Sequence, residues 1–438
     1  DSICDVARCN WRDKIKKGIA ESGGGEENFF PVYCTNPFRM PAGPEITKKE
    51  EESETAVFVI SRIAGEGADR QAEGGDYFLT EEEHCRLEAV CRLYQNVVII
   101  VNAGGQIDLS FLDEFCNIKG LLILVQPGME GGNALADILS GKVNPSGKLT
   151  DSWAYQYEDY PNSETFSHNN GNVEREYYEE GIYVGYRYFD TFGIPVRYEF
   201  GFGLSYTEFA LSDCTVKKEQ NGMLEITAKV KNTGDRTGKE VVEVYASLPD
   251  GRMEKEARRL IGFTKTAELK PQEEQTVKIQ IPWKNFASYD EAQSAWILEE
   301  GKYGIELGNS LGTAQEYAVL QVTEEIILEQ DKKICGMEFG KNEITCKNRK
   351  EQADRQVDVP VIELQVVVEY RKNAELYPED AMEFVHTLTK EECMKLASGD
   401  PGKAQGSNLG AAGIVVPGSA GETSDCVKEK GLASLALA

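Results

Sequence analysis

The 438-residue chain contains only three histidines, His84, His168 and His386. This scarcity argues against a Ser-His-Asp triad and against a histidine-rich metal site. None of the eleven cysteines forms a CxxC pair or another metal-site spacing, so the sequence implies neither a metal nor an organic cofactor. An odd number of scattered cysteines predicts reduced thiols and a cytoplasmic location.

Positive charge is also scarce. The chain has 47 lysines and arginines against 74 aspartates and glutamates, which gives a formal net charge of −27. Nucleic acids and anionic membranes bind basic surfaces, so we expect neither as a partner. No apolar run approaches the roughly 20 residues that a membrane-spanning helix needs. The length and the ordinary composition instead predict two or three globular domains.

Strand and helix patterns alternate over residues 1–205, which predicts a doubly wound α/β domain with a parallel sheet. Thr80 and Glu83 have the spacing of a capping box and predict a helix start. A second helix through Ile138 ends near Gly141. Unbroken Val/Ile sequence suits a strand that is buried on both faces. The predicted strands cover 56–62, 96–102 and 121–125.

The hydrophobic pattern changes to a period of two over residues 206–325, which predicts an antiparallel β-sandwich. We interpret 326–375 as a linker, with its most linker-like sequence at 347–358. Residues 376–438 start a further domain, with a helix near 389–397 and a Gly-rich stretch at 406–421. The alternating segments of the sandwich are 224–230, 241–245, 277–281 and 303–307.

Glu66 follows the first predicted strand, between Gly65 and Gly67. Flanking glycines allow a loop at the carboxyl end of a strand to project one carboxylate into a ligand cleft. Spacing alone leaves two interpretations open, because a lone Gly-x-Gly is weak evidence. Glu66 is either a solvated loop residue or a catalytic general acid/base.

Three later segments favour the catalytic interpretation of Glu66. Residues 141–150, 178–190 and 198–206 closely resemble the C-terminal half of glycoside hydrolase family 3, the β-glucosidase family. Residues 231–245 resemble the fibronectin type III-like domain of the same family. The resemblance covers about 56–320 in the family's order.

Residues 376–438 resemble the start of that family's TIM-barrel domain, through the sequences at 388–392 and 416–423. In most members the barrel precedes the other two domains, whereas here it follows them, as in the permuted members. We expect a truncated barrel, an incomplete N-terminal edge of the α/β domain, and chain ends that are internal to a larger protein. The resemblance places the family's nucleophilic aspartate in the barrel, outside this chain.

The resemblance implies retaining hydrolysis of terminal β-D-glucosyl or related residues by two carboxylates. Glu66 matches the family's acid/base position, on a loop that reaches over the barrel mouth. We expect Asp69 and Arg70 to pair and brace this loop, with direct substrate contact as the alternative, and Asp76 to help them. The chain alone is expected to be inactive, because the covalent step needs the nucleophile.

Other carboxylates compete with Glu66. Glu130 stands at a helix start, where an acid complements the helix dipole. Glu179 and Glu180 precede an expected aromatic strand and are interpreted as packing or surface residues. We also expect packing roles for the aromatic residues, although stacking on a sugar is the alternative for the first four. These residues are Tyr183, Tyr186, Tyr188, Phe189 and Trp153.

Two other functions compete with the glycosidase. One is a non-catalytic carbohydrate-binding or scaffold protein that retains these domains. The other is a flavodoxin-like module that binds phosphate through the glycine-rich loop. The second is disfavoured, because the loop has no lysine at P-loop spacing and Glu66 would repel phosphate.

Overall fold

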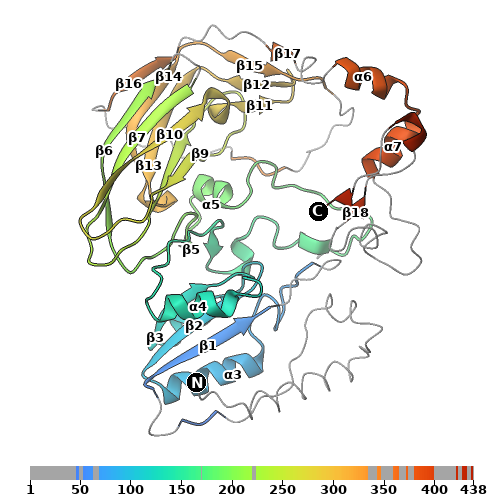
Figure 1. Cartoon of the computed structure of the whole chain (residues 1–438). Helices are drawn as coiled ribbons and strands as arrows, with labels where there is room; N and C mark the ends of the chain where they lie inside the picture. Colours follow the sequence, from blue (N-terminus) through green and yellow to red (C-terminus); the bar gives the residue numbers. More distant parts are fainter. Residues whose placement is uncertain are drawn as a thin grey trace. The chain divides into compact units, whose positions relative to one another are not determined.

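The computed structural model comprises two compact units, of which the first contains an α/β domain and a β-sandwich (Figure 1). The first unit takes in Asp1–Ala292, Trp296–Leu328 and Lys333–Val368. No helix in the described part of the chain is long and apolar enough to cross a bilayer. The structure describes residues 46–48, 53–62, 69–168, 170–219, 223–333, 343–346, 359–364, 371–372, 379–398, 421–422, 427–431 and 436–437.

The α/β domain contains three parallel strands in the order β1-β2-β3, namely β1 (Thr55–Ser61), β2 (Asn96–Asn102) and β3 (Ile118–Ile123). All three predicted strands are therefore present. The last one starts at Ile118 rather than at 121, because Ile118 pairs with Val97 beyond a register shift. It stops before Val125, whose φ of 58° is incompatible with a strand.

Helix α3 (Glu81–Leu93) connects the first two strands and contacts both of them. Its predicted capping box is confirmed. The Glu83 amide donates to Thr80 Oγ1 at 3.1 Å, and the Thr80 amide donates to Glu83 Oε2 at 2.9 Å. Helix α4 (Gly131–Leu139) follows β3, also as predicted.

The core of this domain forms around β2. Val97, Ile99 and Val101 are fully buried on one face, and Ile100 is fully buried on the other. Burial on both faces is what the Val/Ile run predicts for a central parallel strand. Trp153 is also in this core, so its predicted packing role is confirmed.

The second part of the first unit is a β-sandwich that contains all four predicted strands. Its two main sheets have the orders β10-β7-β6 and β16-β14-β13-β8-β9. One continuous apolar core fills the space between them and includes Trp283, Phe286 and Tyr303. The strands are β6 (Phe209–Lys218), β7 (Met223–Asn232), β8 (Val241–Ser247), β9 (Arg258–Lys265), β10 (Glu274–Pro282), β13 (Gly301–Gly308), β14 (Gln315–Val322) and β16 (Val361–Leu364).

The sandwich extends into the range 326–375, which the sequence predicts to be a linker. Strand β16 pairs in parallel with β14, and Leu364 is buried in the sandwich core. Strand β15 (Ile326–Gln330) contributes Ile326 to the same core. Strands β15 and β16 therefore pack against the sandwich through apolar side chains. Residues 347–358 lie outside the described part of the chain.

One predicted strand is a helix in the structure. The aromatic segment expected to be extended forms α5 (Tyr186–Phe192), between Gly185 at φ 59° and Gly193 at φ 65°. A left-handed glycine just after the last turn is a common helix stop. Tyr183 and Phe189 are buried, which confirms packing as their role.

The second unit is described mainly as two helices, α6 (Glu379–His386) and α7 (Lys390–Ser398). The predicted helix near 389–397 is α7. It starts with a capping box, in which the Glu392 amide donates to Thr389 Oγ1 at 3.2 Å. Of the two sequences on which the barrel prediction rests, 388–392 covers the start of α7, whereas most of 416–423 lies outside the described residues. Residues 406–420 of the Gly-rich stretch also lie outside them.

Candidate active site

Glu66 lies outside the described residues, but the structure describes both flanks of its loop. Segment 63–68 leaves β1 after Arg62 and rejoins the described chain at Asp69 and Arg70. Asp69 is exposed, whereas Arg62 is buried and Arg70 is half-buried. The loop predicted to carry the acid is thus bounded by two arginines that are held in the protein.

Arg62 is anchored by a dense set of hydrogen bonds. Its side chain forms a two-point ion pair with Glu83 of α3, at 2.8 Å and 3.1 Å. Its Nε donates to the Asp76 carbonyl at 2.6 Å, and Nη2 donates to the Phe78 carbonyl at 3.1 Å. Glu83 therefore has two roles, as a capping residue and as the partner of Arg62.

Arg70 is held by Asp76, not by Asp69 as the sequence led us to expect. Its Nε lies 2.7 Å from Asp76 Oδ1, and Nη2 donates to the Asp76 carbonyl at 2.9 Å. Its Nη1 donates to the Gln106 carbonyl at 2.6 Å. The Asp76 side chain is fully buried, and the Arg70 side chain is partly buried. Asp76 can reach Arg70 because the 73–78 turn carries its side chain into the protein.

A cavity of about 350 Å³ opens at the carboxyl ends of all three parallel strands. Its lining includes Arg62 after β1, Asn102 at the end of β2, and Leu124 and Gln126 after β3. Ligands of open α/β sheets bind at this edge. Arg62, which bounds the candidate acid loop, therefore also lines the crevice where a ligand is expected.

The competing carboxylates have structural partners. Glu130 is the N-cap residue of α4, is exposed, and accepts a hydrogen bond from Asn133 Nδ2 at 2.6 Å. Glu180 accepts a hydrogen bond from Asn162, and the Glu179 carbonyl accepts one from the Ile344 amide at 2.7 Å. The side-chain contacts favour the structural interpretation of Glu130 and Glu180, whereas the contact of Glu179 involves only its backbone.

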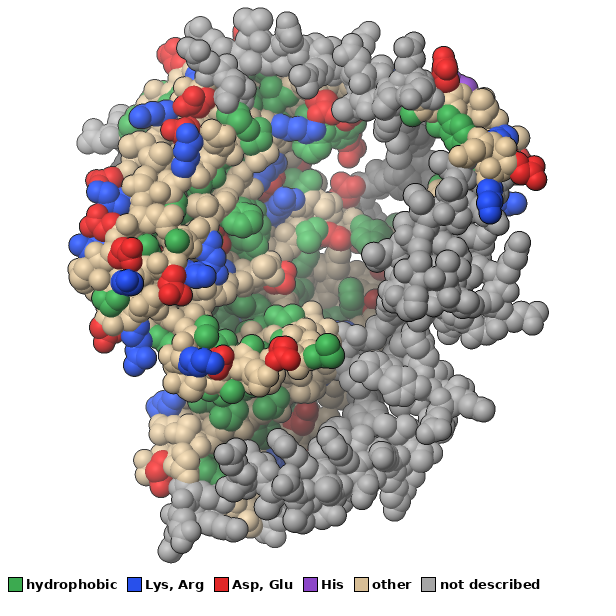
Figure 2. Space-filling model, viewed as in Figure 1, with side chains coloured by type: hydrophobic (Ala, Val, Ile, Leu, Met, Phe, Trp, Pro, Cys, Tyr) green, Lys and Arg blue, Asp and Glu red, His purple; other side chains and the backbone are tan. Residues whose placement is uncertain are grey.

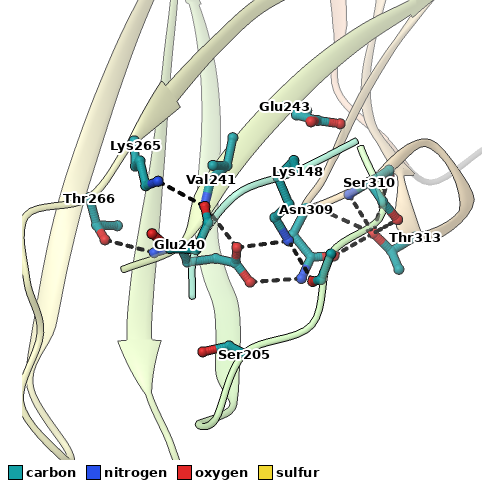
Figure 3. Close-up of polar contacts among 12 residues, drawn as sticks. Lys148, Ser205, Glu240, Val241, Glu243, Lys265, Thr266, Asn309, Ser310 and Thr313 are labelled. Atoms are coloured by element: carbon teal, nitrogen blue, oxygen red, sulfur yellow. Dashed lines mark hydrogen bonds and ion pairs between the residues drawn. The ribbon is translucent and has the colours of Figure 1, made fainter. Parts of the chain in front are cut away.

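The sequence motif at 141–150 lies at the junction between the α/β domain and the sandwich. Lys148 Nζ lies 3.0 Å from Glu240 Oε1, and Asn309 Nδ2 donates to the other oxygen of Glu240 at 2.9 Å (Figure 3). Asn144 Nδ2 donates to the Thr237 carbonyl at 3.0 Å. Residues that carry the family resemblance thus dock the two domains, a role that spacing could not reveal.

Acidic side chains lie close to one another at this junction. Glu243 is 5% exposed, and its Oε2 accepts a hydrogen bond from Tyr245 at 2.5 Å. Burial raises the pKa of Glu243, and the nearby Glu240 and Glu199 raise it further, against the opposing effects of Tyr245 and Lys148. The balance of these effects holds the pKa of Glu243 above the ordinary value of a glutamate.

Surface charge does not form a single-sign patch on the visible face of the sandwich. Figure 2 shows acidic and basic side chains interspersed there. The net charge of −27 is therefore not expressed as one acidic surface on that face. Among the described residues, no group of three or more His, Cys, Asp or Glu side chains is arranged as a metal site.

Comparison with known proteins matches both domains of the first unit. The sequence profile of the glycosyl hydrolase family 3 C-terminal domain matches residues 13–186. That of the fibronectin type III-like domain matches residues 240–311. The two matches occur in the order expected from the motifs.

Individual relatives agree with these matches. A beta-glucosidase of Ruminococcus albus is 41% identical over 317 residues, which are 71% of this chain and 32% of the relative. An exo-alpha-(1->6)-L-arabinopyranosidase of Bifidobacterium longum is 35% identical over 290 residues, covering 66% of this chain and 37% of the relative.

Solved structures show the same likeness. Beta-glucosidase 3B of Thermotoga neapolitana in complex with alpha-D-glucose is 34% identical, with a TM-score of 0.60, over 72% of this chain and 47% of that one. The chain thus spans between about a third and a half of the length of these relatives. By its two matched domains and these likenesses, the chain belongs to glycosyl hydrolase family 3.

Proposed function

We propose that this chain supplies the acid/base part of a retaining β-glycosidase that removes terminal β-D-glucosyl or related residues. The observation that carries the proposal is the arginine-bounded loop at the ligand edge of the sheet, with Glu66 inside it. Glu66 protonates the leaving glycosidic oxygen and then deprotonates the attacking water. A barrel aspartate outside this chain acts as the nucleophile.

The names of the relatives support the substrate class. One relative is named a beta-glucosidase, and one solved relative is a beta-glucosidase in complex with alpha-D-glucose. Another is named an arabinopyranosidase, so the family domains present here accompany more than one sugar specificity. We assign the choice of sugar to contacts of the barrel, and we propose that residues 376–438 begin that barrel.

Asp69 and Arg70 keep a supporting role in this proposal. Arg70 orients the loop through Asp76, while the exposed Asp69 is free to face the substrate side. The chain carries one of the two required carboxylates, so it does not catalyse the covalent step by itself.

The experiment compares this chain with the same chain extended through the barrel, on a panel of aryl β-glycosides. We expect turnover only in the extended protein, and the preferred sugar will identify the substrate. Activity in the short chain would contradict the divided active site. A folded but inactive extended protein that still binds oligosaccharides would favour a non-catalytic carbohydrate-binding function.

A further inference from the structure

Asp76 occupies the centre of the contacts that hold both ends of segment 63–68. Its carbonyl oxygen accepts from Arg62 Nε at 2.6 Å and from Arg70 Nη2 at 2.9 Å. Its carboxylate accepts from Arg70 Nε at 2.7 Å and from the Gln71 amide at 2.6 Å. One buried residue thus joins the start and the end of the loop.

We propose that Asp76 and Arg70 are positioning residues, which fix the two ends of the loop and thereby set the reach of Glu66 toward the leaving oxygen. This proposal rests on the proposed function. Neither residue is a catalytic residue, because each acts through the loop. The clamp is defined here as Arg62, Arg70 and Asp76.

The clamp is itself held rigidly. The turn that carries Asp76 is closed by a hydrogen bond from the Gly75 amide to the Phe78 carbonyl at 2.8 Å, with Gly75 at φ 93°. Glu83 holds the far side of Arg62 by two hydrogen bonds. Gly105 packs so closely that a Cβ there would lie 3.0 Å from Arg70 Nη1. The arginines are therefore fixed by the scaffold without any contact from a substrate.

Each arginine of the clamp is paired with one carboxylate. Arg62 pairs with Glu83, and Arg70 pairs with Asp76. Because each arginine is neutralised by its own carboxylate, we expect the clamp to act through geometry and not through charge. A general acid must lie within hydrogen-bond reach of the leaving oxygen, and a displacement of about 1 Å can cost about 10²-fold in rate.

The test is Arg70→Lys in the full-length protein that includes the barrel. Lysine keeps the charge but cannot donate at once to the Asp76 carboxylate, the Asp76 carbonyl and the Gln106 carbonyl with the same fork. We expect kcat on an alkyl β-glucoside to fall by about 10². A 2,4-dinitrophenyl β-glucoside needs little acid assistance, so its rate of glycosyl transfer to the enzyme should change by no more than about 3-fold. KM and the limbs of the pH profile should stay in place.

Arg197→Lys is the matched control. Arg197 forms a two-point pair with Asp113 elsewhere in the same domain, at 3.0 Å and 2.5 Å, and contacts neither end of the loop. The Arg197→Lys protein should hydrolyse the alkyl and the 2,4-dinitrophenyl β-glucoside at the wild-type rates. Asp76→Asn is the second clamp variant, and it should show the same selective loss as Arg70→Lys. Thermal unfolding of each variant identifies any that does not fold.

Equal losses on both substrates, or no loss on either, in a folded Arg70→Lys protein would overturn the positioning role. Glu66→Ala separates this failure from that of the proposed function. If Glu66→Ala spares the alkyl substrate, the proposed function fails. If Glu66→Ala gives the selective loss and the clamp variants do not, only the positioning role fails.

Discussion

Lys148 of the α/β domain and Glu240 of the fibronectin type III-like domain form a buried ion pair, with Nζ 3.0 Å from Oε1. Their side chains are 11% and 8% exposed. The lysine comes from one of the motifs on which the family resemblance rests. That motif therefore has a physical role, which is to hold the sandwich against the α/β domain.

Removing the lysine should destabilise the first unit. Lys148→Met leaves Glu240 buried without its cation, which typically costs about 3–5 kcal/mol. Urea unfolding should show a loss of that size in the free energy of unfolding. Lys142→Met is the control, because Lys142 is 72% exposed in its pair with Asp137 and should cost less than about 1 kcal/mol. Equal effects of the two changes would contradict the docking role.

The stability of the junction should depend on pH through Glu243. Burial raises the pKa of this carboxyl in the folded protein. The stability it contributes is therefore fully present below the unfolded value of about 4.3 and is lost as the pH rises through the raised value.

The measurement compares wild type with Glu243→Gln, whose side chain cannot ionise. The free energy of unfolding of the wild type relative to this variant should decrease as the pH rises from about 4 to about 8. A difference that stays constant, or that increases with pH, would show that Glu243 is not the titrating group.

Close packing of Gly201 against Glu243 gives another prediction. Gly201 has a φ of 80°, and a Cβ there would lie 2.3 Å from Glu243 Oε2. Gly201→Ala combines the strain of a left-handed residue, about 1–2 kcal/mol, with displacement of a buried carboxylate. Gly171→Ala has the same strain, at φ 79°, but meets nothing within 4 Å. Thermal unfolding should therefore show a larger loss for Gly201→Ala, and equal losses would contradict the packing argument.

Much of the fold could be predicted because its signals are local. The capping box at Thr80 and Glu83 and the Val/Ile run of β2 depend on neighbouring residues, and both are confirmed. The sequence predicts a strand where α5 forms, because aromatic residues suit strands and the left-handed conformation of the two flanking glycines depends on the folded structure. The sequence does not predict strand β16, because its partner β14 lies a long stretch of chain before it.

The candidate site shows the same division between local and distant signals. Glu66 is identified by a motif, and it stays a prediction because it lies outside the described residues. The sequence predicts only a supporting role for Asp76, since its two arginine partners meet at a turn whose geometry the sequence does not specify. Lys148 lies in a recognised motif, yet its partner is 92 positions away in another domain.

The most direct test of the central claim is Glu66→Ala in the full-length protein, assayed on alkyl β-glucosides with and without azide. Loss of a general acid should lower turnover by about 10²–10⁴-fold. Azide attacks the glycosyl-enzyme without base assistance, so it should accelerate that step and yield a β-glycosyl azide when an activated aryl substrate is used. Near-wild-type hydrolysis of the alkyl glucosides by Glu66→Ala would contradict the assignment of Glu66 as the acid/base.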